Sequence, residues 1–194
     1  MAKPNGISKQ ELIESAKRCI RDKGIDKLTL KAVAEGAGVT QGTVYYHFKT
    51  KEQLLFEIVQ SLCDASWKVV QPAQTAGEDR LASILQALAG ARERAAYRSF
   101  YHTLFFSLVV HSLQNEEMLK QLGRLLEKEN AQAAELLDGW LPASARSIVS
   151  MESWGILANA LMDGLALQAL INPDFESEKI YAELSALLAR IAAE

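Results

Sequence analysis

The sequence has few of the residues that build redox centres, metal sites and loop-rich folds. Its 194 residues include only two cysteines, three histidines and four prolines. Cys19 and Cys63 each fall within an apolar helical stripe, which favours buried free thiols over a disulfide or a metal site. The small number of prolines and of β-branched runs favours an all-helical fold.

Motifs of enzymes and membrane proteins are also missing. The histidines, cysteines and acids show no metal-ligand spacing and no nucleophile elbow, and there is no glycine-rich phosphate loop. Asp163 lies in an apolar stretch without an obvious partner histidine, so we expect no enzyme activity, no metal and no cofactor. No segment has the length and purity of a membrane span, and the N-terminus does not resemble a signal peptide. These features predict a cytosolic protein without a membrane partner.

The charges are unevenly distributed along the chain, although the net charge of −3 does not by itself point to a nucleic acid. Residues 1–51 carry 10 Lys and Arg against 5 Asp and Glu, whereas the remainder carries 11 against 19. A basic N-terminal part on an acidic body is expected if only the N-terminal part meets phosphate. The alternative is that the excess positive charges are scattered over a solvated surface.

Residues 40–48, Thr-Gln-Gly-Thr-Val-Tyr-Tyr-His-Phe, predict a short helix whose exposed face suits a polyanion. Thr40 is a suitable N-cap, and Val44 and Phe48 lie four residues apart, so that they share a face that packs on a core. Most of the other side chains can form hydrogen bonds and none is acidic. The pattern therefore favours a helix that enters the major groove of DNA.

A second helix precedes this one and completes a helix-turn-helix pattern. Thr29 is placed to cap it, and Gly36 and Gly38 allow a tight turn at its end. The spacing Ala34-x3-Gly38-x5-Val44 supplies a small residue, a turn and a branched apolar residue where two helices cross. This spacing alone is a weak signal, and its value lies in coinciding with the caps and the non-acidic face.

Three stretches in the first third of the chain also match a known family. They are Ala34-Glu35-Gly36-Ala37-Gly38-Val39, Gly42-Thr43-Val44-Tyr45-Tyr46-His47-Phe48 and Lys51-Glu52-Gln53-Leu54-Leu55. On these residues the chain resembles the TetR family of bacterial transcriptional regulators. A further stretch, residues 160–173, resembles the penultimate helix of that family.

We therefore expect an all-α fold of about nine helices. A three-helix, helix-turn-helix DNA-binding head at residues 1–50 is followed by an effector-binding and dimerisation body at residues 51–194, which opens with a connector helix. Residues 1–7 are interpreted as a flexible basic arm. Breaks are predicted at residues 71–77 and 141–144, with five helices after the first break.

Two capping boxes mark helix starts in the N-terminal part. Ser8 and Glu11 open the first helix, which Gly24 ends. Thr50 and Gln53 open the connector helix, which outruns a three-helix core and therefore links the head to the body.

The resemblance assigns DNA contacts position by position. The residues carried over are Thr29, Thr40, Gln41, Gly42, Thr43, Tyr45, Tyr46, His47 and Lys51. Thr40, Gln41 and Thr43 are expected to reach base edges or the adjacent backbone. The residues expected to bind phosphates are Tyr45, Tyr46, His47 and Lys51. Tyr45 and Tyr46 cannot both face the core, so one structural tyrosine is an alternative, as is a packing role for His47.

The resemblance also implies a homodimer in which the last two helices of each subunit form a four-helix interface. Residues 150–171 are apolar nearly all round, which requires burial on more than one side. A monomer with a large internal bundle is the alternative. The interface residues expected are Trp154, Leu157, Leu161, Gly164, Leu165, Ile180, Leu184 and Leu187.

The resemblance further implies a small-molecule effector pocket in the body. The aromatic residues of the body suit a hydrophobic ligand. The lining residues expected are Trp67, Tyr101, His102, Phe105, His111, Trp140, Met151, Trp154 and Asn159. For each of these, membership of the plain core is the alternative. The function expected is a homodimeric repressor that binds a palindromic operator and is released by a ligand, and the alternative is a ligand-independent or activating regulator of the same fold.

Overall fold

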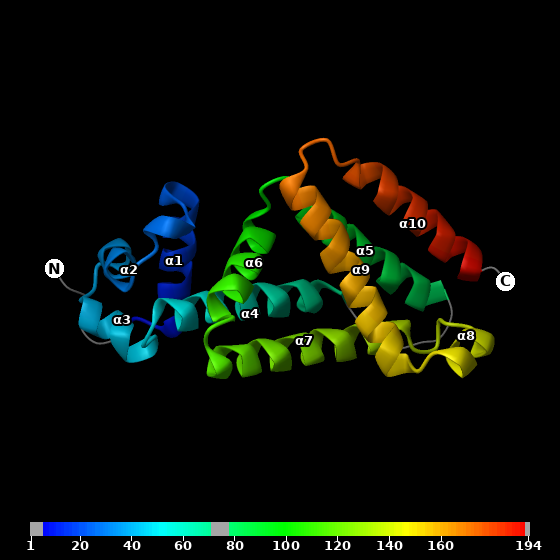
Figure 1. Ribbon diagram of the computed structural model, residues 1–194, viewed down its shortest axis with the longest axis horizontal. Coiled ribbons are helices and arrows are strands. Elements are labelled where there is room, and N and C mark those ends of the chain that lie inside the picture. The colour runs from blue at the N-terminus through cyan, green and yellow to red at the C-terminus, as the bar shows by residue number, and fades with distance from the viewer. Residues whose placement is uncertain (1–5, 71–77, 193–194) are drawn as a thin grey trace. The chain divides into compact units, whose positions relative to one another are not determined.

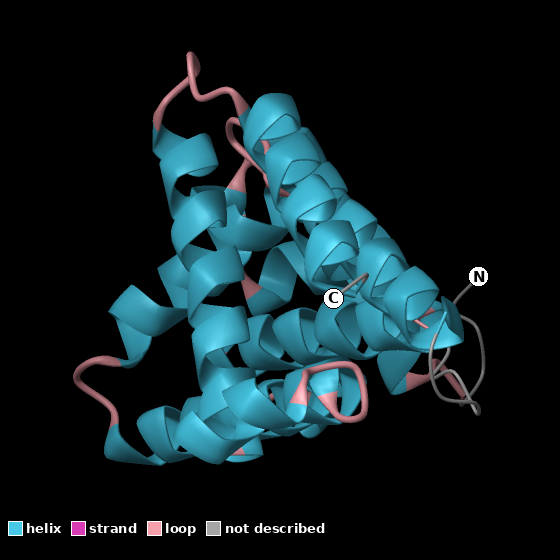
Figure 2. Cartoon of the chain, turned by 90° about the vertical axis from the view of Figure 1, so that its right-hand side faces the viewer, coloured by secondary structure: helices cyan, strands magenta, loops and turns pink. Residues whose placement is uncertain are grey.

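The computed structural model describes residues 6–70 and 78–192, and within them all regular structure is helical (Figure 2). Ten α-helices and a short 3-10 turn follow one another along this part of the chain (Figure 1). The all-α prediction is therefore confirmed. The predicted break at residues 71–77 and most of the predicted basic arm lie outside the described residues.

The first helix, α1 (Lys9–Lys23), begins and ends where the sequence predicts. The Ser8 side chain accepts from the Glu11 amide while the Glu11 carboxylate accepts from the Ser8 amide, which completes the capping box. Gly24 ends the helix with a φ of 85°. The buried face of α1 includes Leu12 and Ala16, which are fully buried.

The next two helices, α2 (Leu30–Ala37) and α3 (Gln41–His47), form the predicted helix-turn-helix. Gly38 makes the turn in the left-handed region, with φ 68° and ψ 31°. Gly36 was predicted to allow the turn as well, but it lies inside α2. A Cβ at Gly36 would lie 2.8 Å from the Ser15 hydroxyl of α1, so this glycine permits close contact between the two helices.

The connector helix, α4 (Lys51–Val69), begins directly after Thr50, as predicted. The Gln53 amide donates to the Thr50 hydroxyl, as in the predicted capping box, but the Gln53 side chain donates to Glu57 instead of completing the box. Two lysines of α1 tie it to α4: Lys9 pairs with Glu57 at 2.6 Å, and Lys17 donates to Ser61 at 3.1 Å.

The chain divides into two compact units, and each is described here by itself. The first comprises the described residues up to Leu62 together with Leu104–Leu122, and the second comprises the described residues of Cys63–Thr103 and those from Gly123 onward. The remaining helices are α5 (Glu78–Arg94), α6 (Phe100–Ser112), α7 (Glu116–Leu137), α8 (Ala143–Ile148), α9 (Met151–Ile171) and α10 (Ser177–Ala192).

Helix α8 is the α-helix that the sequence did not predict. It begins directly after Pro142, within the stretch that was expected to be a plain break. Proline fixes its own φ near the helical value and lacks the amide that a helix start leaves unpaired, so it both interrupts one helix and opens the next.

The core of the second unit is built from α5, α9 and α10, which lie side by side in Figure 1. Its buried residues include Leu88, Ala166, Ala169 and Tyr181, with Leu184 packed against them. Ala166 and Ala169 are the residues that α9 contributes to the buried part of this core.

One face of α9 meets α7 even more closely, at Gly155. A Cβ built on Gly155 would overlap the backbone carbonyl oxygen of Asn130 and would lie 2.9 Å from the Ala134 Cβ. The contact therefore joins backbone to backbone and leaves no room for any side chain.

The opposite face of α9 is exposed and apolar, which corrects one expectation. By length and composition, Met151–Ile171 could cross a membrane. Its most apolar stretch of 18 residues has a mean hydropathy of 1.4, and 17% of that stretch is buried. The sequence was expected to contain no such segment, and that expectation was wrong because isolated polar residues such as Asn159 and Asp163 barely lower an 18-residue average.

Candidate functional site

Helix α3 presents its polar residues to solvent while two apolar residues fix it to the core. Val44 and Phe48 are fully buried, as predicted. The Thr40 hydroxyl accepts from the Thr43 amide at 3.2 Å and lies 3.1 Å from the Thr43 hydroxyl. Gln41 and Gly42 are exposed at the start of the helix, so the backbone amides there are approachable from outside.

Two tyrosines extend this surface, and the structure decides between the alternatives for them. Tyr45 is 54% exposed and Tyr46 is 75% exposed, so neither belongs to the core. The Lys49 ammonium lies 5.0 Å from the ring centroid of Tyr45 and 5.8 Å from that of Tyr46. Cation–π contacts of this kind hold a flexible cation beside two phenol groups.

Lys49 is a residue that the sequence reasoning missed. The family pattern was carried over only to positions quoted in its motifs, and Lys49 falls between two of them. The signal that was available is a lysine directly after the aromatic run, on the basic part of the chain. We name Gln41, Thr43, Tyr45, Tyr46 and Lys49 the recognition surface. Thr43 is half-buried, and the other four side chains are exposed.

Three further predicted DNA contacts lie beside this surface in the same unit. Thr29 caps α2 by accepting from the Ala32 amide at 3.0 Å. Lys51 donates to the backbone oxygen of Ile25 at 3.3 Å, so its ammonium is partly engaged within the protein. His47 is half-buried, and its ring meets that of Tyr46 edge-on at 5.2 Å.

Of the residues predicted to line an effector pocket, the structure brings only Trp67 to the cavity described in the second unit. Tyr101, His102 and Phe105 are buried or half-buried, whereas His111 is exposed. Asn159 donates to Asn130 at 2.9 Å. Trp140, Met151 and Trp154 are half-buried outside the lining of that cavity.

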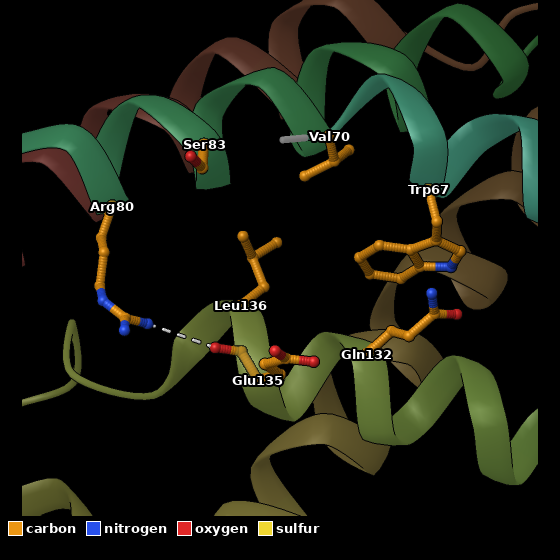
Figure 3. Close-up of a pocket in the computed structure, with 7 residues that line it drawn as sticks. All are labelled: Trp67, Val70, Arg80, Ser83, Gln132, Glu135 and Leu136. Carbon is orange, nitrogen blue, oxygen red and sulfur yellow. Dashed lines mark hydrogen bonds between the residues drawn. The ribbon is translucent and has the colours of Figure 1, made fainter. Parts of the chain in front are cut away.

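The cavity itself has a volume of about 190 Å³ and lies between α4, α5 and α7. Figure 3 shows Trp67 and Val70 above Gln132 at one end, Leu136 in the middle, and Arg80 at the other end. The seven lining residues are Trp67, Val70, Arg80, Ser83, Gln132, Glu135 and Leu136. Six of them were missed. Four of these are polar residues, which on amphipathic helices are usually solvated, and the other two are the apolar residues Val70 and Leu136.

A polar cluster lies next to Trp67 in the same unit. The Trp67 indole donates to a carboxylate oxygen of Glu129 at 2.8 Å, and the Cys63 sulfur lies 3.1 Å from the Tyr101 hydroxyl. Burial raises the pKa of Glu129 and raises the pKa of Cys63 to about 12, and for the thiol the nearby Glu129 charge adds to this effect. A thiol with this pKa stays protonated near neutral pH, so Cys63 is a poor nucleophile.

His102 is held as a neutral side chain. Burial lowers its pKa to about 4, and its Nδ1 lies 3.1 Å from the backbone oxygen of Arg94 and 3.2 Å from the Ser99 hydroxyl. A neutral ring that donates to a backbone carbonyl is a structural group, which favours the core alternative for this residue.

The buried acid in α9 gives a testable pH dependence. Burial, with a further contribution from Glu129, raises the pKa of Asp163 to about 6, although Arg94 acts in the opposite direction. Between about pH 4 and pH 6 the native state therefore binds more protons at this site than the unfolded chain, so the stability that the protonated acid contributes is lost as the pH rises through about 6.

We expect Asp163→Asn to raise the free energy of unfolding by about 2 kcal/mol above pH 7 and to have almost no effect near pH 4. The amide cannot ionise, so the variant escapes the cost of a buried charge. Urea denaturation of both proteins from pH 4 to pH 8 measures the difference. A difference that stays constant over this range would contradict the assignment.

The residues predicted for a dimer interface fall into two groups. Leu157, Leu161 and Leu187 are 52%, 47% and 54% exposed, and Gly164 is exposed beside them. The others are half-buried, and of these Leu165 and Leu184 pack against the chain's own core. An outward apolar face thus exists on α9 and α10, and it is formed by half of the predicted residues.

Helix α3 follows a left-handed glycine turn, is capped at its start and is held to the core by apolar residues. Its outer face is polar and not acidic. Together these features define a helix-turn-helix protein. Comparison with known proteins agrees with this class. Residues 12–58 match the family described as bacterial regulatory proteins, tetR family. The N-terminal part of the chain is therefore that of the TetR family of bacterial transcriptional regulators, and the curated relatives that the chain resembles over most of its length are regulators and not enzymes.

Curated relatives extend the similarity beyond the head. The chain is 28% identical to the probable acrEF/envCD operon repressor of Escherichia coli over 165 residues, which cover 79% of this chain and 66% of that protein. It is 27% identical to the HTH-type transcriptional regulator TtgR of Pseudomonas putida over 180 residues, which cover 86% of this chain and 82% of that protein.

A solved structure shares the fold. FadR of Thermus thermophilus, a TetR-family repressor whose structure contains lauroyl-CoA, superposes with a TM-score of 0.69. The match covers 94% of this chain and 93% of that one at 18% identity, a level at which the similarity speaks for the fold alone.

Proposed function

We propose that the protein is a homodimeric repressor that binds a near-palindromic DNA operator and is released by a small molecule bound in its body. The observation that carries this proposal is the recognition surface. It combines hydrogen-bonding side chains, two exposed phenols and a cation, and the Thr40 cap fixes the start of the helix that carries them. Such a surface supplies both phosphate contacts and base-edge contacts.

Each part of the recognition surface has a distinct task in this proposal. Gln41 and Thr43 at the start of α3 contact base edges, where a glutamine pairs with adenine and a threonine methyl group meets thymine. Gly42 lets the backbone approach. Tyr45, Tyr46 and Lys49 bind phosphates and set the register, and Thr29, His47 and Lys51 add backbone contacts at its edge.

The proposed dimer pairs the outward faces of α9 and α10. Leu157, Leu161 and Leu187 stay about half exposed in the single chain, and isolated soluble proteins rarely leave such a contiguous apolar face open. A second copy is favoured over lipid as the cover, because the other face of α9 is packed against protein at Gly155 and Asp163 is largely withdrawn from solvent. Two heads would then reach successive major grooves, ~34 Å apart. We place the protein in the cytoplasm, where its operator lies.

Helix α4 is the proposed route from ligand to DNA. It begins at Lys51 beside the recognition surface and carries Trp67, which lines the cavity, in its last turn. The helix is continuous between these two residues. A ligand releases DNA only if it binds more tightly to the arrangement whose heads do not match the operator.

We expect Leu161→Glu to convert the protein from a dimer to a monomer and to abolish stable operator binding. The charge would be buried at the centre of the proposed interface without a partner. Sedimentation equilibrium measures the mass, and Val110→Glu, which places the same charge on an exposed apolar position of α6, is the control. A monomeric parent protein, or a Leu161→Glu variant that remains dimeric, would refute the dimer.

Titration of ligands against operator-bound protein separates the proposed repressor from its alternative. Release of DNA by a compound that binds the body supports the effector step. Operator occupancy that no bound compound changes would instead favour a ligand-independent or activating regulator with the same recognition surface. Lauroyl-CoA, found in the related structure, serves as one large, hydrophobic test compound.

A further inference from the structure

Helix α1 is attached to α4 by polar side chains at two points, and both points lie within the first unit (Figure 1). At the start of α1, the Lys9 ammonium lies 2.6 Å from a carboxylate oxygen of Glu57. Roughly two helical turns further along α1, the Lys17 ammonium donates to the Ser61 hydroxyl at 3.1 Å. A single contact would let α1 pivot about it, whereas two contacts at different heights fix the angle between the helices.

Lys17 differs from Lys9 because it is almost entirely withdrawn from solvent. The residue is 7% exposed, whereas the Lys9 side chain is 46% exposed. The Lys17 ammonium also donates to Glu14 on its own helix at 2.9 Å, and this hydrogen bond lowers the pKa of Glu14. Because a buried charge is unfavourable unless it is paired, the two partners restrict where the ammonium can lie.

An apolar side chain at this position would not carry the cost of burying a charge. Replacement of a buried charged contact by a hydrophobic residue of similar size is often neutral or even stabilising. A lysine is therefore not needed here for stability alone. Its hydrogen bond to Ser61 has a preferred direction that apolar packing lacks, and buried polar contacts are best known for setting register and orientation.

The orientation of α1 matters because the rest of the head is built on this helix. The Ser15 hydroxyl of α1 donates to the backbone oxygen of Val33 in α2 at 3.1 Å. The Lys9 ammonium lies 5.8 Å from the ring centroid of Phe48, the residue directly after α3. We therefore expect α1, α2 and α3 to move as one body, so that the angle between α1 and α4 sets the direction in which α3 projects.

We propose that Lys17 is a positioning residue, whose contact with Ser61 fixes the direction of the recognition surface relative to α4 and so limits the dimer to one spacing of operator half-sites. One base pair shifts a half-site by about 3.4 Å and turns it by roughly 35°, so a head held at a fixed angle accepts a single spacing. Helix α4 continues beyond Ser61 to Val69, so a movement of α4 reaches the head through the same contact. The half-site spacing rests on the proposed function, whereas the fixed angle does not.

Selection from a pool of random duplexes with full-length variants tests the consequence for spacing. Lys17→Met removes the ammonium and keeps an unbranched stem, and Ser61→Ala removes its partner. Both variants are expected to recover the half-site sequence of the parent protein, because the recognition surface is intact. Their preference for one spacing over its one-base-pair neighbours is expected to fall from about tenfold to about twofold. Variants that keep the parent's sharp preference would overturn the proposal.

Two control variants separate positioning from a general loss of structure. Ser61→Thr keeps the hydroxyl, and Lys23→Met removes the same charge from an exposed position of α1, so both are expected to retain the parent's preference. The Tm of Lys17→Met is expected to be no lower than that of the parent protein. A lower Tm and weaker DNA binding at an unchanged spacing would make the lysine merely structural and would overturn its assignment.

A distance measurement on the DNA-free protein tests the fixed angle without reference to an operator. Spin labels are attached after Glu35→Cys in α2 and Glu127→Cys in α7, which are both exposed, whereas the native Cys19 and Cys63 are buried. Double electron–electron resonance measures the distribution of distances between the labels. The distribution is expected to broaden when Lys17→Met is added.

The two experiments together distinguish this proposal from the proposed function. A broadened distance distribution in a protein that enriches no inverted repeat would support the fixed angle and contradict homodimeric operator binding. An unchanged distribution in a protein that does enrich an inverted repeat would support the proposed function and overturn the role of Lys17.

Discussion

The variant Tyr46→Ala is expected to bind duplex DNA on the order of 100-fold more weakly than the parent protein. A hydrogen bond from a neutral donor to a charged phosphate contributes about 1.5 kcal/mol, and a homodimer loses it twice. Tyr46 is the most exposed aromatic residue of α3, and its ring is not part of the core, so its removal is expected to leave the head folded. Fluorescence anisotropy with a labelled operator measures the affinity.

The salt dependence of binding distinguishes a phosphate contact from a general loss of structure. Lys49→Gln is expected to reduce the slope of log K against log salt by about 0.9 for each protomer, because each protomer releases one counterion fewer. Lys120→Gln removes the same charge from an exposed position of α7 and is expected to keep the parent slope. Unchanged affinity in Tyr46→Ala and an unchanged slope in Lys49→Gln would together remove the recognition surface from the DNA contact.

The second large effect is expected at Gly155. Gly155→Ala is expected to lower the free energy of unfolding by about 3 kcal/mol, which is near the upper end for overpacking, because the added Cβ meets a backbone carbonyl that cannot rotate away. For a chain of this length the loss corresponds to a Tm lower by roughly 6–12 °C. Thermal unfolding followed by circular dichroism measures the shift.

Gly123→Ala in α7 is the matched control for this effect. A Cβ at Gly123 meets no atom within 4 Å, so the same change is expected to stabilise the helix by up to about 1 kcal/mol. If Gly155→Ala were as stable as Gly123→Ala, the close backbone contact of α9 with α7 would be wrong.

The local features of the head could be predicted from the sequence because they depend on neighbours within four residues. Thr40 caps α3 and Gly38 turns the chain, and Val44 and Phe48 are buried, all as expected. Each of these depends on a cap, a glycine φ or a four-residue spacing that the sequence displays directly.

The body could be predicted in outline but not in its sites. Helix α9 is apolar nearly all round, so its sequence does not reveal that Leu165 faces the chain's own core whereas Leu161 faces outward. The cavity joins Arg80 and Gln132, which lie 52 residues apart on different helices, and neither has an apolar or motif signal. Such sites arise from packing between helices, which periodicity within one helix does not encode.

The DNA-bound form of the dimer can be tested most directly by selecting duplexes from a random DNA pool with the full-length protein. Our account expects an enriched inverted repeat whose half-sites are centred one helical turn apart, about 34 Å, and whose recovery falls when Tyr46→Ala replaces the parent protein. A folded, dimeric protein that enriches no sequence even at low salt, or one that enriches the same site after the Tyr46→Ala change, would contradict it.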